Sequence, residues 1–192
     1  MASREKILEN ILRNQPPQKT LPDLSKAAIG AGDYFNDFKS ILEKIGGAVI
    51  EITTLESINE YVQKHYSSTN RIVTTIAELP WFNSDLSDNA HSFEDVDLAV
   101  LRGHFGVAEN GAVWVTNELM GDRAIPFIAQ HLALVIHKRD IVPSLHEVYE
   151  KIDPSYDYGT FIAGPSKTAD IEQSLVLGAH GPKSMVVFVL AT

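Results

Sequence analysis

One stretch of the chain gathers side chains that could hold an anion. Residues 164–182 read GPSKTADIEQSLVLGAHGP and place Ser166, Lys167 and Thr168 directly after a Gly-Pro pair. Hydroxyl and ammonium groups can bind a carboxylate or a phosphate, and the two hydroxyl residues can equally cap a short helical turn. A predicted strand precedes the stretch, which would place it at the carboxyl edge of the sheet, where open α/β sheets bind ligands. The predicted ligand-binding residues of this stretch are Gly164, Ser166, Lys167, Thr168, Asp170 and Gly181. The alternative is a capped turn whose charges are solvated.

His180 lies in the same stretch, between Ala179 and a Gly-Pro pair. An imidazole changes its charge near neutral pH, so His180 is a candidate acid, base or hydrogen-bond donor. The alternative is a loop histidine whose ring is satisfied by a backbone carbonyl.

A second motif, Ala108-Glu109-Asn110-Gly111, resembles the Glu-Asn-Gly element of CoA-transferases. In those enzymes the glutamate attacks an acyl-CoA thioester and forms a covalent intermediate, which requires a carboxylate held by a tight turn. The resemblance makes Glu109 a candidate nucleophile, base or hydrogen-bond acceptor, with Asn110 and Gly111 facing the ligand. Asn-Gly is also a strong hairpin signal, so an ordinary β-turn is the alternative.

Composition excludes several chemistries. The chain has 192 residues and no cysteine, so it can hold no disulfide, no thiol nucleophile and no thiolate-bound iron–sulfur cluster. The net charge of −9 argues against nucleic acid or an anionic membrane as the main partner. The seven histidines form no helical i, i+4 pair, so no metal site is predicted. No apolar run is long enough to span a bilayer, and the first 14 residues lack a signal-peptide core, so we expect a cytoplasmic protein.

Hydrophobic periodicity predicts an α/β fold with a mostly parallel sheet and flanking helices. Helices are predicted over residues 2–13, 34–45, 54–65, 125–130 and 145–151. Strands are predicted over residues 48–52, 71–76, 97–101, 112–116, 132–137, 158–163 and 185–190. Asp33 is the expected N-cap of the second helix, and Ser144 with Glu147 has the spacing of a capping box. Residues 79–95 and 103–111 are expected to be connections.

The domain organisation follows from the single Pro-Pro pair of the sequence. Pro16-Pro17 ends any helix, so residues 1–30 are predicted to form an N-terminal helix and a linker arm, with one domain over residues 31–192. The arm is expected to pack on the domain or on a partner.

The motif at residues 164–182 closely resembles the C-terminal signature of the lactate-utilization (LUD) domain family, in particular its lactate-utilization protein C branch. Three further segments resemble the same family: DLAVLRGHFGVAENG at 97–111, Arg123 with Ile125-Pro126, and residues 131–142. The resemblance covers about residues 30–192. Two segments depart from the expected pattern, Gly103-His104-Phe105-Gly106 and Asn117-Glu118-Leu119-Met120.

This resemblance implies a NagB/RpiA/CoA-transferase-like fold and a role in oxidising L-lactate to pyruvate. It implies no cofactor on this chain, since iron–sulfur clusters belong to partner proteins. Three hypotheses follow: a cluster-free subunit or accessory factor of such an iron–sulfur complex, a small CoA-transferase-like or phosphometabolite-binding enzyme that uses Glu109, and a metabolite sensor or scaffold without turnover. In each case a small anionic metabolite is the expected ligand, in an edge cleft between residues 103–111 and 164–182.

Overall fold

The computed structural model describes residues 3–20, 32–83, 86, 89–153, 155–168 and 175–191. The chain divides into two compact units, Met1–Gly30 and Ala31–Thr192. The first unit contains helix α1 (Ser3–Arg13), none of whose residues is buried. Its apolar side chains Ile7, Leu8, Ile11 and Leu12 are all exposed.

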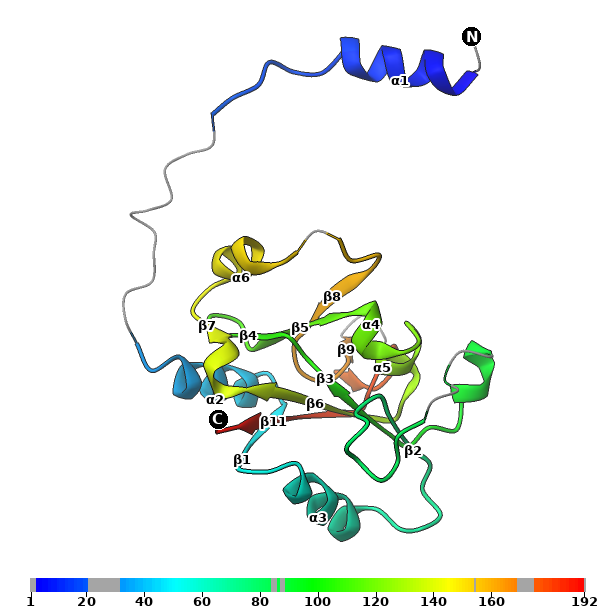
Figure 1. Ribbon diagram of the computed structural model, residues 1–192, viewed down its shortest axis with the longest axis vertical. Coiled ribbons are helices and arrows are strands. Elements are labelled where there is room, and N and C mark those ends of the chain that lie inside the picture. The colour runs from blue at the N-terminus through cyan, green and yellow to red at the C-terminus, as the bar shows by residue number, and fades with distance from the viewer. Residues whose placement is uncertain are drawn as a thin grey trace. The chain divides into compact units, whose positions relative to one another are not determined.

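A five-stranded parallel sheet forms the centre of the second unit (Figure 1). Its strand order is β1-β11-β6-β3-β2, and every neighbouring pair is parallel. The strands are β1 (Ala48–Ile52), β11 (Ser184–Leu190), β6 (His131–His137), β3 (Leu98–Arg102) and β2 (Ile72–Thr74). The middle strands are apolar on both faces, which is typical of a parallel sheet covered from both sides.

Different elements cover the two faces of this sheet. Helix α3 (Glu56–His65) packs Ile58 and Val62 against one face, together with residues 76–81. Helix α2 (Tyr34–Lys44) covers the other face with Phe38 and Leu42. The short helices α4 (Asn117–Met120) and α5 (Ile125–Ile128) contribute to the same core.

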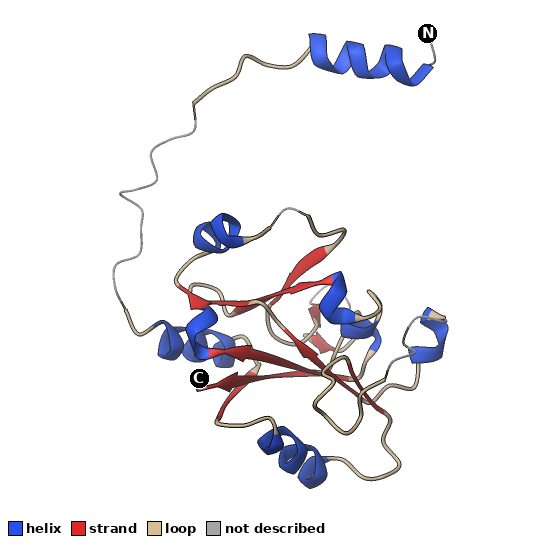
Figure 2. Cartoon of the chain, viewed as in Figure 1, coloured by secondary structure: helices blue, strands red, loops and turns tan. Residues whose placement is uncertain are grey.

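A second, four-stranded sheet lies on the α2 side of the first (Figure 2). Its order is β7-β4-β5-β8, made of β7 (Ile141–Val142), β4 (Phe105–Val107), β5 (Ala112–Thr116) and β8 (Gly159–Ile162). Strand β5 alternates between two faces: Val113 and Val115 join the core shared with the parallel sheet, and Trp114 points to the opposite face. Helix α6 (Leu145–Lys151) covers that outer face through Val148.

Three smaller pieces complete the described structure. Strands β9 (Lys167–Thr168) and β10 (Val176–Leu177) form an antiparallel pair, and short 3₁₀ helices occupy Ala90–Phe93 and Lys138–Asp140. No helix of the described residues is long and apolar enough to cross a membrane.

The predicted fold class is confirmed, and so are the seven predicted strands, with small shifts at their ends. Asp33 caps α2 as predicted, because its side chain accepts a hydrogen bond from the Asn36 N–H. Two local predictions were wrong. Residues 103–111 contain strand β4, whose three residues are too few to give a periodic signal, and the Ser144 side chain makes no capping bond on α6.

Candidate functional site

Glu109 and its neighbours form the turn between β4 and β5. Gly111 has a φ of +69°, its N–H donates to the Val107 carbonyl at 2.9 Å, and the Asn110 side chain accepts from the Ala112 N–H at 2.9 Å. These are the features of an Asn-Gly hairpin turn, closed by its own hydrogen bonds.

The Glu109 carboxylate is exposed but engaged. Its Oε1 accepts a hydrogen bond of 2.7 Å from the Leu145 N–H, the first residue of α6. A carboxylate at a helix N-terminus satisfies one of the free N–H groups there and interacts favourably with the helix dipole. Glu109 thus performs the capping that the sequence assigned to Ser144. Its action as a nucleophile stays a prediction.

The predicted anion-binding residues divide between two neighbours. Ser166 Oγ accepts from the His180 N–H at 3.3 Å, and the ideal Cβ position of Gly181 lies 3.3 Å from the Ser166 Cβ, so these three residues meet. Lys167 Nζ instead donates to the Ile45 carbonyl at the end of α2. Thr168 lies in β9, and Asp170 lies outside the described residues.

The expected position of this loop in the sheet was wrong. The strand before it is β8, which belongs to the four-stranded sheet, so the loop does not start at the carboxyl edge of the parallel sheet. It leads into the amino end of β11, where the Lys183 N–H donates to the Gln130 carbonyl at 2.8 Å, just before β6. Gly164, at φ +71°, turns against Ile45. The ligand-binding role of the residues in this loop remains a prediction. The loop leads into the amino end of a strand of the parallel sheet and does not start at a carboxyl end.

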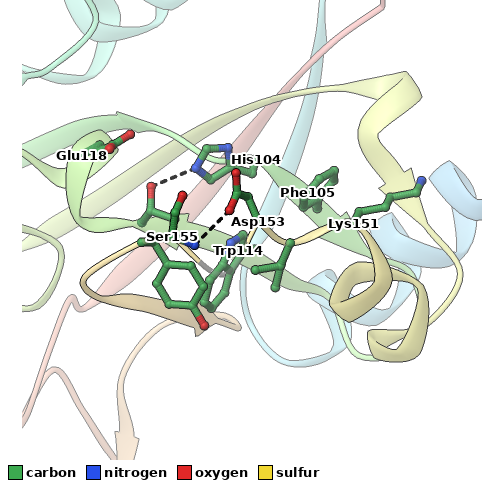
Figure 3. Close-up of a pocket in the computed structure, with 10 residues that line it drawn as sticks. His104, Phe105, Trp114, Glu118, Lys151, Asp153 and Ser155 are labelled. Atoms are coloured by element: carbon green, nitrogen blue, oxygen red, sulfur yellow. Dashed lines mark hydrogen bonds between the residues drawn. The ribbon is translucent and has the colours of Figure 1, made fainter.

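A cavity of about 260 Å³ opens on the outer face of the second sheet (Figure 3). His104 lies two residues after the end of β3 and lines this cavity. Its Nε2 lies 2.8 Å from Thr116 Oγ1. Trp114 and Phe105, paired across β5 and β4, form an aromatic wall. The connection from α6 to β8 adds Asp153 to the lining.

Electrostatics distinguish the polar groups of this cavity. Burial lowers the pKa of His104, against the opposing effects of Glu118 and Asp140, so the imidazole is neutral at pH 7. The Ser155 N–H donates to Asp153 Oδ1 at 2.9 Å and is the main reason that the pKa of this carboxyl lies below its ordinary value. A neutral imidazole beside a hydroxyl can accept or pass a proton, and the carboxylate stays ionised.

The sequence reasoning singled out none of these side chains for chemistry. His104 and Glu118 come from the two segments that depart from the LUD pattern, which was the available signal. Trp114 is only 5% exposed although it lines the cavity. Among the described residues, no group of three or more His, Asp or Glu side chains is placed to hold a metal ion.

Comparison with known proteins adds the family. The model of the LUD domain matches residues 74–190, which is more than half of the chain. The chain belongs to the LUD domain family. The matched LUD region begins in β2 and includes the hairpin, the cavity and the 164–182 loop.

Several curated proteins resemble this chain over about half of its length. A protein named "Lactate utilization protein C" from Anoxybacillus flavithermus is 35% identical over 107 residues, which cover 54% of this chain and 48% of that protein. One of the same name from Oceanobacillus iheyensis is 27% identical over 117 residues, 57% of this chain and 50% of that one. "Uncharacterized protein YkgG" from Escherichia coli is 26% identical over 117 residues, 57% and 51% respectively. The chain spans about half the length of the curated relatives it matches.

A solved structure has the same fold. The crystal structure of a DUF162 family protein from Deinococcus radiodurans aligns with a TM-score of 0.56 at 16% identity, and covers 82% of this chain and 96% of that one. At this identity the likeness concerns the fold alone.

Proposed function

We propose that this LUD-domain chain acts in lactate utilisation, as a cluster-free component of a system that oxidises L-lactate to pyruvate. The observation that carries the proposal is that this LUD-domain chain is similar, over about half of its length, to proteins named Lactate utilization protein C. Oxidation of L-lactate to pyruvate releases two electrons and two protons, which must reach an acceptor.

The amino-acid composition supports an acceptor on other proteins. The 192 residues include no cysteine, so no thiolate-ligated iron–sulfur cluster can take up the electrons on this chain. The proposal therefore includes iron–sulfur partner proteins and a complex in which this chain binds or positions a reactant.

Growth and copurification test the proposal together. A strain that lacks the gene should grow poorly with L-lactate as sole carbon source, and the wild-type gene should restore growth. A tagged full chain purified from lactate-grown cells should bring down cysteine-rich proteins whose visible absorption and iron content show clusters, and a tag-only control should not. Normal growth of the deletion strain without such partners would contradict the proposal.

The purified chain provides a second test. Incubated alone with L-lactate and an artificial electron acceptor, it should form no pyruvate, and turnover should require the copurified proteins. Pyruvate formed by the chain alone would show a self-sufficient oxidoreductase and overturn the role of a component.

A further inference from the structure

The cavity beside His104 presents more negative than positive charge. Glu118 and Asp153 both line it, and both are exposed. Among the described lining residues Lys151 is the sole cation, and Figure 3 shows its side chain directed away from His104 and Asp153. A carboxylate or phosphate entering here would meet two like charges, and such a juxtaposition disfavours binding.

Aromatic rings form the apolar part of the same cavity. Trp114 and Tyr156 meet edge to face with their centroids 5.2 Å apart, and the Tyr156 side chain is 37% exposed at the mouth. Ring faces attract cations through their quadrupole, and tryptophan and tyrosine are the most effective rings for this contact. Aromatic side chains are used in this way to recognise organic ammonium groups, and nearby carboxylates would add opposite charge.

His104 does not oppose a cation. The charged groups around its ring are Glu118 and Asp140, and burial keeps the imidazole neutral at pH 7. His104 Nε2 and Thr116 Oγ1 are hydrogen-bonded to each other. The Thr116 hydroxyl oxygen can still accept a hydrogen bond from a ligand N–H, because a hydroxyl group both donates and accepts.

We propose that this cavity binds a small organic ammonium compound, with the cationic group near Asp153 and Glu118 and the carbon skeleton against Trp114 and Tyr156. A cavity of about 260 Å³ limits the ligand to a small metabolite. The proposal does not depend on a role in lactate utilisation.

Three isosteric probes test the charge preference directly: L-alaninamide is a cation, L-lactamide is neutral and L-lactate is an anion, on nearly one skeleton. The chain has two tryptophans, so a ¹H–¹⁵N spectrum of the full chain shows two indole N–H peaks, and Trp114→Phe identifies which is which. Trp81 lies in a different groove, with Tyr66 and Pro80, and serves as the internal reference.

At pH 7, L-alaninamide should shift the Trp114 peak saturably and leave the Trp81 peak in place. Loss of one charge-assisted hydrogen bond corresponds to about a tenfold loss of affinity, so L-lactamide should bind about tenfold more weakly and L-lactate more weakly still. The affinity for L-alaninamide should fall about tenfold in Asp153→Asn, and it should also fall in Glu118→Gln.

Asp157→Asn provides the matched control, because this exposed carboxylate lies in the same connection but does not line the cavity. Its affinity for L-alaninamide should equal that of the unmodified chain. Tighter binding of L-lactate than of L-alaninamide, an unchanged affinity in Asp153→Asn, or no shift of the Trp114 peak with any probe would each overturn the proposal.

Discussion

The 108–111 turn and the cavity beside His104 lie at opposite ends of the same β-hairpin, and they use reactive side chains differently. At the turn, the Glu109 carboxylate caps α6 and Asn110 closes the turn, so both polar side chains serve the fold. In the cavity, Glu118 and Asp153 are both exposed and lie beside a neutral imidazole. Glu109 and Asp153 are both exposed, and each accepts a backbone hydrogen bond, from Leu145 and from Ser155 respectively. Their settings differ, because Glu109 caps a helix and Asp153 lines a cavity.

A substitution at Gly111 should have the largest effect on stability of the changes that test the turn. Its φ of +69° is strained for residues with a side chain, and an added Cβ would lie 3.0 Å from backbone atoms of Leu42. Gly111→Ala should lower the free energy of unfolding by about 2 kcal/mol or more, measured by urea denaturation. A loss below about 0.5 kcal/mol would show that the turn is loosely held.

Glu109 should show the next largest effect. Glu109→Ala removes the cap of α6 and should lower the free energy of unfolding by about 1 kcal/mol. Glu109→Gln keeps an oxygen acceptor, so it should lose less. If Glu109 were instead a nucleophile with no structural role, both variants would have the stability of the unmodified chain.

Lys167 tests whether the predicted anion loop is also part of the fold. Its ammonium group donates to the Ile45 carbonyl at the C-terminal end of α2, an interaction that complements the helix dipole. Lys167→Met should cost about 0.5 kcal/mol in thermal or chemical unfolding. Inorganic phosphate that stabilises the unmodified chain but not this variant would instead support the anion site.

The pH dependence of stability tests the burial of His104 in the cavity and of His131 at the start of β6. Burial is the first cause of the lowered pKa of His104 and of His131, so the unfolded chain binds protons on these residues before the folded chain does. Below the unfolded pKa of about 6.5 the free energy of unfolding should therefore fall as the pH falls, and it should be flat above it.

His104→Gln should remove part of that pH dependence and leave the part due to His131. The measurement is the urea midpoint at pH 7.5 and at pH 5.5 for each variant. An equal difference between the two pH values in His104→Gln and in the unmodified chain would show that the imidazole is as accessible to protons as in the unfolded state.

Local patterns were sufficient to predict most elements of the fold. Continuous apolar runs such as 132–137 identified buried parallel strands, and helical periodicity identified α2 and α3, because these signals lie within one element. The helix α6 was predicted from the spacing of Ser144 and Glu147, although Ser144 makes no capping bond. The strand order and the second sheet could not be predicted, since pairings such as Ala48 with Val186 join residues far apart in the chain.

The candidate site was harder for the same reason. Glu109 meets Leu145 only through the tertiary fold, and no sequence spacing indicates that contact. The cavity brings together the ends of β3 and β5 with the connection after α6, three segments that carry no common motif. Of its side chains, only the unusual segments around His104 and Glu118 could have drawn notice.

The position of β11 has a consequence for how the molecule is made. This strand follows all the other described strands along the chain, yet it lies between β1 and β6 inside the parallel sheet. During synthesis on the ribosome β1 therefore has no strand to pair with, and the hydrogen-bonding groups along its edge stay unpaired until residues 184–190 emerge. Loss of this last strand would remove an inner member of the sheet, so a nascent chain stopped short of it is the form most in need of a chaperone.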